Sequence, residues 1–168
     1  MSSPPFFGKY RGVVTNNNDP GLMGRIKARV PDVLGNNESG WAMACTPFAG
    51  SGTGFFALPS VGAGVWIEFE QGDPDYPIWA GCWWGAPTDV PTETLPLQTQ
   101  KVVLKTAGGQ SIVLDDTPAV GGIFLKTSFG TKVSIGALII EIDDGKGGKI
   151  KMEGPKVTIN NGALEVLF

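Results

Sequence analysis

Carboxylates are almost the only residues in this chain that could carry catalysis. The 168 residues include 16 Asp and Glu, two Cys and no His. General acid–base catalysis or a metal site needs side chains gathered in a cleft, such as paired carboxylates or a nucleophile with its base. The candidate acids share a sequence setting rich in Gly, Pro and Asp: Asp73, Asp75, Asp115, Asp116, Asp143 and Asp144. Because Asp in that setting shapes turns, we predict a protein that is not an enzyme, with no catalytic residue and no cofactor.

Three other features could suggest chemistry. Cys45 and Cys82 lie in apolar sequence without CxxC spacing, so we predict buried free thiols in preference to a disulfide or a redox site. Residues 49–54 are glycine-rich, but they lack the GK[ST] ending of a phosphate loop, and a flexible inter-strand loop is predicted. Asp143 and Asp144 leave one alternative open, since turns from several chains could gather oxygen ligands for a weakly bound cation. No metal site is otherwise predicted.

The last third of the chain, from residue 101 to 168, repeats one short unit. Each unit has an apolar residue, one residue of any type and a second apolar residue, followed by a few polar or glycine positions. Side chains at i and i+2 of a strand share a face, so each pair predicts a short strand with one apolar face, separated from the next by a polar or glycine turn. The sixteen positions are Val102, Leu104, Ile112, Leu114, Ile123, Leu125, Val133, Ile135, Ile140, Ile142, Ile150, Met152, Val157, Ile159, Leu164 and Val166.

Strands this short cannot each hold a core. A single chain is expected to leave its apolar pairs half covered and its strand edges unpaired. Winding three identical chains around one axis would bury the pairs and complete the backbone ladder between chains. We therefore predict that the sixteen positions form the core of a homotrimer, in an intertwined trimeric (triple-stranded) β-helix.

The first half of the chain predicts a different unit. In residues 24–31, Ile26, Ala28 and Val30 alternate with basic residues, and in residues 65–70 Val65, Ile67 and Phe69 alternate with polar ones. Together with residues 6–14, 41–45, 55–58 and 78–84, these segments predict five or six short antiparallel strands, as in a small closed barrel of the OB-fold type. The predicted class is all-β, with residues 1–85 as the barrel, residues 86–99 as an extended Pro-rich linker and residues 100–168 as a β-helix spike.

Several of these motifs occur together in one family. The run Gly24-Arg-Ile-Lys-Ala-Arg-Val-Pro31, the strand Val65-Trp-Ile-Glu-Phe69 and the turn Gly72-Asp-Pro-Asp-Tyr-Pro77 resemble the OB-fold domain of central spike proteins. These are the VgrG and phage baseplate assembly protein V family of contractile injection systems, in which a β-helix follows the OB domain. The chain resembles a minimal member, without the lysozyme domain or the long preceding domain of larger relatives, so a separate hub protein is expected.

The resemblance implies partners and a location. The family forms homotrimers whose OB domains mount on hub and inner-tube proteins, and whose β-helix crosses the target membrane transiently with a PAAR-type tip protein at its end. We expect the tip-protein interface at the C-terminal end of the repeat: Gly162, Ala163, Leu164, Val166 and Phe168. No signal peptide is recognisable at residue 1, so the chain is expected to be made in the bacterial cytoplasm and to join an injection particle.

Two alternatives remain open at this point. Residues 164–168 continue the repeat in phase, but their letters also match the beginning of an engineered protease-cleavage tag. An OB-type barrel could instead bind nucleic acid or an oligosaccharide, with Trp79, Trp83 and Trp84 as stacking platforms. Against nucleic acid, residues 1–99 carry five Lys and Arg but nine Asp and Glu, whereas phosphate binding requires positive charge.

Overall fold

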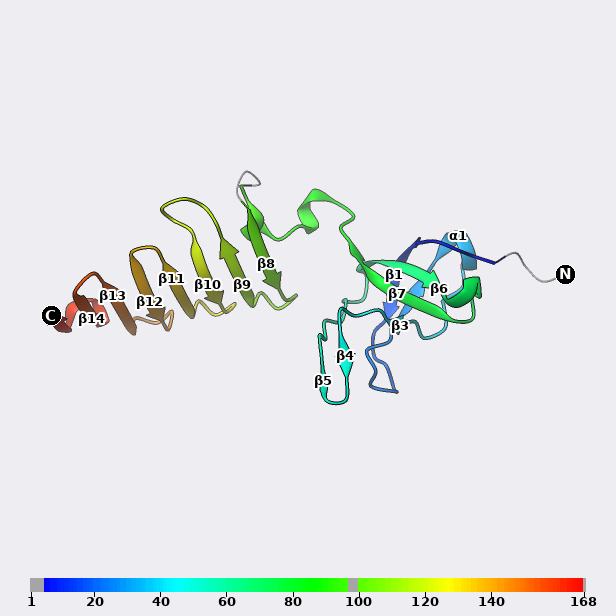
Figure 1. Cartoon of the computed structure of the whole chain (residues 1–168), viewed down its shortest axis with the longest axis horizontal. Helices are drawn as coiled ribbons and strands as arrows, with labels where there is room; N and C mark the ends of the chain where they lie inside the picture. The colour runs from blue at the N-terminus through cyan, green and yellow to red at the C-terminus, as the bar shows by residue number, and fades with distance from the viewer. Residues whose placement is uncertain (1–4, 97–99, 168) are drawn as a thin grey trace. The chain divides into compact units, whose positions relative to one another are not determined.

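Short strands make up nearly all the regular structure of the chain, as the alternating sequence predicts (Figure 1). The computed structural model describes residues 5–96 and 100–167. Within those ranges the one α-helix is the single turn α1 (Pro31–Leu34), and none of the helices is long and apolar enough to span a bilayer. The chain divides into two compact units, residues 1–89 and 90–168, so the fold is all-β in two parts.

The first unit is a five-stranded sheet that closes on itself. Its strands run in the order β2-β1-β6-β7-β3. Their bounds are β1 (Tyr10–Asn16), β2 (Lys27–Arg29), β3 (Met43–Ala44), β6 (Gly64–Phe69) and β7 (Pro77–Trp83). The two outer strands meet where Ile26 and Ala42 exchange backbone hydrogen bonds of 3.2 and 2.7 Å. The predicted OB-type barrel is therefore present, although β3 pairs with β7 in parallel and not antiparallel as expected.

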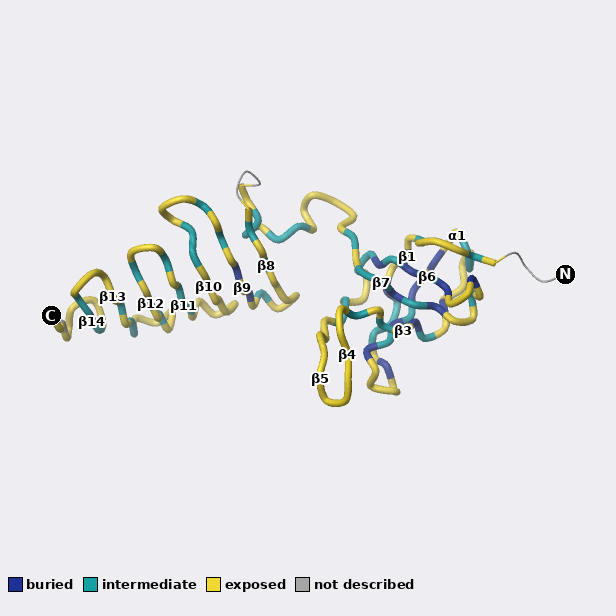
Figure 2. The backbone as a smooth tube through the Cα atoms, in the orientation of Figure 1, coloured by how far each residue is buried: buried dark blue, intermediate teal, exposed yellow. Residues whose placement is uncertain are grey.

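The core of the barrel consists of the residues that alternation predicts. Ile26, Ala28 and Val30 are fully buried, and Val65, Ile67 and Phe69 fill the space opposite them. Figure 2 shows these buried segments gathered inside the first unit. Alternation of apolar and polar residues therefore identified the inward face correctly.

Three predictions for this unit were wrong. Residues 49–54 form a small hairpin of β4 (Ala49–Gly50) and β5 (Thr53–Gly54), so the glycine-rich segment is not an unstructured loop. Residues 55–58 form no strand. Cys45 and Cys82 are free thiols as predicted, but both are exposed and not buried.

The predicted linker is only partly extended. It contains two single turns of 3-10 helix, η2 (Pro87–Asp89) and η3 (Thr92–Thr94). Glu93 pairs with Lys105 Nζ at 2.8 Å, and the carbonyl of Leu95 accepts a hydrogen bond from Lys101 Nζ at 2.9 Å. Residues 93–95 of the linker are therefore held against the strand that begins at Lys101.

The second unit is one antiparallel sheet in which eight strands follow one another in chain order. The strands are β8 (Lys101–Lys105), β9 (Ser111–Asp115), β10 (Gly122–Lys126), β11 (Lys132–Gly136), β12 (Ile139–Asp143), β13 (Lys149–Glu153), β14 (Lys156–Ile159) and β15 (Leu164–Leu167). Each strand pairs with its neighbours in the same chain, so the expectation that the ladder would be completed between chains was wrong for these strands. Among the described strands of this sheet, the outer edges of β8 and β15 are the ones without a partner strand.

Candidate assembly face

One face of the β8–β15 sheet carries all sixteen of the predicted apolar positions. Strand register aligns them in two unbroken lines across the eight strands, because residues that are cross-strand partners project from the same face. The first line is Val102, Leu114, Ile123, Ile135, Ile140, Met152, Val157 and Val166. The second line is Leu104, Ile112, Leu125, Val133, Ile142, Ile150, Ile159 and Leu164. We call this surface the assembly face.

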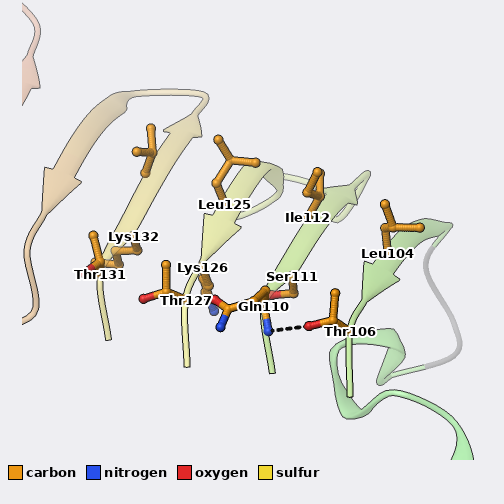
Figure 3. Close-up of a pocket in the computed structure, with 11 residues that line it drawn as sticks. Leu104, Thr106, Gln110, Ser111, Ile112, Leu125, Lys126, Thr127, Thr131 and Lys132 are labelled. Atoms are coloured by element: carbon orange, nitrogen blue, oxygen red, sulfur yellow. Dashed lines mark hydrogen bonds between the residues drawn. The ribbon is translucent and has the colours of Figure 1, made fainter. Parts of the chain in front are cut away.

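Water reaches the assembly face in the single chain. Thirteen of its sixteen side chains are exposed, with Val102 at 64% and Leu104 at 56%, and the other three are half-buried. Figure 3 shows Leu104, Ile112 and Leu125 projecting to the same side of neighbouring strands. They line an open depression of about 310 Å³. A continuous exposed apolar surface on a paired sheet is typical of an interface with another protein chain.

The opposite face of the sheet carries Val103, Val113 and Phe124 at its first three strands and ion pairs across β11, β12 and β13. Lys149 Nζ lies 3.2 Å from Glu141 and 3.1 Å from Asp143, and Lys132 Nζ lies 2.8 Å from Glu141. These lysines hold the pKa of Glu141 below its usual value. The same carboxylates, Asp143 first, raise the pKa of Lys149. The charges of this face are matched, and its side chains at the strand centres are buried or half-buried in the single chain. The assembly face is therefore the one that lacks a cover.

Four of the six candidate acids shape turns, as predicted. Asp73 accepts the backbone N–H of the residue two positions on, and Asp115, Asp143 and Asp144 do the same in the second unit. Among the residues that the structure describes, no group of three His, Cys, Asp or Glu side chains could hold a metal ion. The arrangement of these acids is therefore that of turn-formers.

An ion pair in the barrel was missed by the reading of the sequence. The buried carboxylate of Asp19 accepts hydrogen bonds from the guanidinium of Arg25 and from the backbone N–H groups of Gly21, Met23 and Arg25. The only signal was the Asp-Pro-Gly turn with an Arg six positions after the Asp, a spacing that does not by itself specify a contact.

Two of the three tryptophans considered as stacking platforms make hydrogen bonds within the barrel. Trp79 is buried and its Nε1 donates to the Gly24 carbonyl at 3.1 Å. Trp83 Nε1 donates to the Val65 carbonyl at 3.2 Å, and only Trp84 of the three is largely exposed, at 64%. One exposed ring is a poor platform for successive bases, so these contacts weaken the nucleic-acid alternative.

The predicted tip residues lie at the last strand of the sheet. Gly162 ends the 3-10 turn η4 (Asn160–Gly162) and Ala163 follows it. Leu164 and Val166 lie in β15, where they pair with Ile159 and Val157 of β14 and continue the two apolar lines. Phe168 lies outside the described residues. The repeat therefore continues in phase into β15, whose outer edge is open.

Comparison with known families gives both units an assignment. Residues 10–84 match the type VI secretion system/phage-baseplate injector OB domain. Residues 101–165 match the phage baseplate V C-terminal trimerisation domain. The chain belongs to the VgrG and baseplate V family of spike proteins. Self-association of this family member is consistent with the exposed assembly face, which covers the same residues as the trimerisation domain.

Curated relatives match parts of the chain. The actin cross-linking toxin VgrG1 of Vibrio cholerae is 41% identical over 87 residues, which is 49% of this chain and 8% of the relative. The type VI secretion system spike proteins VgrG4b and VgrG5 of Pseudomonas aeruginosa are 37% and 35% identical, over 44% and 59% of this chain. The chain spans about a tenth of the length of these relatives, and the toxin activity named for VgrG1 is that protein's.

Proposed function

We propose that the chain is the structural central spike of a contractile injection system or phage-tail-like particle, and that it works as a homotrimer. Three copies turn their assembly faces toward a common axis and bury the sixteen apolar side chains. The observation that carries this proposal is the pair of unbroken apolar lines across a sheet whose backbone ladder is already complete within one chain. What such a sheet lacks is a cover for one face, and two further copies supply it.

Three copies are favoured over two for a geometric reason and a family reason. Three equal flat faces make the smallest closed prism, in which every sheet contacts two others. The match of residues 101–165 to a trimerisation domain supports the same number. The opposite face of each sheet, with the ion pairs of Lys132 and Lys149, then forms the outer surface.

The same geometry suits a mechanical role. Eight strands at ~4.8 Å spacing give a shaft of roughly 35–40 Å, with the backbone hydrogen bonds running along its length. The OB domains would mount the trimer on hub and inner-tube proteins, and the shaft would pierce the target membrane when the particle contracts. The chain would be made in the cytoplasm and act as part of the assembled particle.

A PAAR-type tip protein is the proposed partner at the far end of the shaft. The support is the open outer edge of β15, the last strand of the sheet. Deletion of residues 160–168 should abolish capture of a purified PAAR-type protein while the trimer remains. Capture that survives the deletion would contradict this placement of the tip.

Mass measurement tests the central claim. Light scattering of the purified chain should give three times the chain mass of 17.7 kDa. A well-folded monomer would overturn the proposal, because the assembly face would then be stable in water. Co-purification of the trimer with inner-tube and hub proteins tests the mounting role separately.

A further inference from the structure

Three large apolar side chains of the second unit are exposed at turns, away from the assembly face. Phe129 is 85% exposed, Leu138 is 80% and Val120 is 73%. These values are higher than those of any residue on the assembly face. Single exposed apolar residues need no explanation, but the positions of these three are related.

The turns of the sheet alternate between its two long edges, because each strand reverses the direction of the one before (Figure 1). Phe129 lies in the turn between β10 and β11. Val120 lies in the turn between β9 and β10, and Leu138 in the turn between β11 and β12. Phe129 is therefore on one edge of the sheet, while Val120 and Leu138 are both on the opposite edge.

The three residues are also matched in height along the stack of strands. Phe129 lies level with the interval between β10 and β11, one strand spacing or ~4.8 Å from the levels of Val120 and Leu138. The interval between Val120 and Leu138 spans two spacings, ~9.6 Å. That interval is wide enough to admit an aromatic ring.

The turn that carries Phe129 is firmly held. Gln110 donates from Nε2 to Ser128 Oγ at 3.1 Å and accepts the Ser128 backbone N–H at 3.3 Å. On the other side, a Cβ added to Gly145 would meet the backbone of Gly130 at 2.8 Å, so these turns are in close contact. Figure 3 shows Thr106, Gln110, Thr127 and Thr131 together along this edge. Phe129 is thus presented from a fixed turn and not from a loose loop.

A three-fold axis brings opposite edges together. Rotation about the axis keeps every residue at its own height, and each sheet then places one edge against the other edge of its neighbour, a head-to-tail contact that closes after three copies. We propose that Phe129 of one copy packs between Val120 and Leu138 of the next copy and seals each corner of the spike. This inference rests on the proposed trimer and names a second contact surface for the same chain.

Chemical cross-linking tests the contact directly. In a background with Cys45→Ser and Cys82→Ser, Phe129→Cys is combined with Val120→Cys or with Leu138→Cys, and the protein is treated with a short bifunctional maleimide. The expected product is a covalent trimer on a denaturing gel, because each copy is linked to both neighbours. The matched control combines Phe129→Cys with Pro155→Cys, which is on the same edge as Val120 but three strand spacings, ~14 Å, from Phe129.

The outcomes separate this inference from the trimer itself. A trimer by light scattering that gives no covalent trimer with either pair overturns the corner contact and leaves the proposed function standing. Equal linking of the Pro155 control also overturns it. A monomer overturns both. As a second measurement, Phe129→Ser should lower the thermal midpoint of the trimer, and this drop should be largely lost in a Val120→Ser, Leu138→Ser background, because contacting residues are not additive.

Discussion

The carboxylate of Asp19 lies 2.7 Å from a terminal guanidinium nitrogen of Arg25, inside the loop that joins β1 to β2. Three backbone N–H groups of the same loop, from Gly21, Met23 and Arg25, also donate to this carboxylate. The Arg25 guanidinium and then these backbone donors hold the pKa of Asp19 well below its usual value. The buried side chain of Asp19 therefore fixes the conformation of this loop. The loop leads directly to Ile26, whose backbone bonds to Ala42 close the barrel.

Asp19→Asn should destabilise the barrel at neutral pH and make its stability less dependent on acid. Because the pKa of Asp19 is lower in the folded state than in the unfolded state, its contribution is complete above about pH 4 and is lost as pH falls toward the folded value. The free energy of unfolding of the unmodified protein should thus fall more steeply on acidification than that of the variant. Urea unfolding at several pH values measures both slopes.

Asp75→Asn is the control for this experiment, since Asp75 is an exposed acid in another turn of the barrel. It should leave both the stability at neutral pH and the acid slope close to those of the unmodified protein. Equal slopes for the Asp19 and Asp75 variants would mean that the buried pair does not set the acid sensitivity.

Trp79→Phe should weaken the barrel by leaving the Gly24 carbonyl without its donor. The indole of Trp79 is buried and its N–H bond to Gly24 is 3.1 Å long. An unsatisfied buried acceptor costs about 1–3 kcal/mol, and denaturant unfolding should show a loss of that order. Trp84→Phe, at a largely exposed ring, should change the free energy of unfolding little. A similar loss in both variants would exclude the hydrogen bond as the cause.

The two apolar lines of the assembly face were predictable, but the pairing of their strands was not. Val133 and Ile135 share a face because they are two residues apart on a strand, and that relation depends on local geometry alone. The same alternation is compatible with a ladder inside one chain or between chains, since both leave the side chains on the same face. The structure completes the ladder in the chain, so the pattern identified the buried surface without identifying the hydrogen-bond partners.

In the barrel, alternation failed where the strand is irregular. Ile67 pairs with Trp79, yet Val65 pairs with Cys82, so β7 carries one extra residue at this point. That bulge shifts the alternation, and Cys82 reaches the surface, although its apolar neighbours predicted burial. The alternation of apolar and polar residues also could not predict the ion pair of Asp19 and Arg25. Both residues lie in a loop, and a contact within a loop depends on the geometry of its turns.

Gly145→Ala should destabilise the second unit more than Gly154→Ala. Both glycines have positive φ, +73° and +57°, so an alanine at either site is strained by about 1–3 kcal/mol. Only at Gly145 would the added Cβ also meet backbone, 2.8 Å from Gly130, whereas nothing lies within 4 Å at Gly154. Thermal unfolding followed by circular dichroism should rank the two variants in this order. Equal midpoints would contradict the close contact between the turns.

Ile135→Asp combined with Ile142→Asp should abolish the trimer and leave each barrel folded. The two isoleucines lie on adjacent strands of the assembly face, and each is about half exposed in the single chain, at 45% and 46%. A single chain can therefore hydrate the new carboxylates, but an assembled trimer would have to bury six of them, at several kcal/mol for each unpaired charge. Light scattering should give the mass of one chain, with the near-ultraviolet spectrum of the barrel tryptophans unchanged.

The matched control places the same two charges on the other face of the sheet. Ser134 and Thr158 lie in strands β11 and β14, across from Glu141 and Lys151, on the face that carries the ion pairs. Ser134→Asp with Thr158→Asp adds two carboxylates to the face that meets no other copy, so this variant should remain trimeric. Repulsion between the new carboxylate in β11 and Glu141 acts within one chain and not between copies. If both variants dissociate, added charge alone disrupts the spike. If neither variant dissociates, the apolar lines do not face the axis. Three sheets packed through the assembly face require that the isoleucine variant be monomeric and that the Ser134 and Thr158 variant remain trimeric.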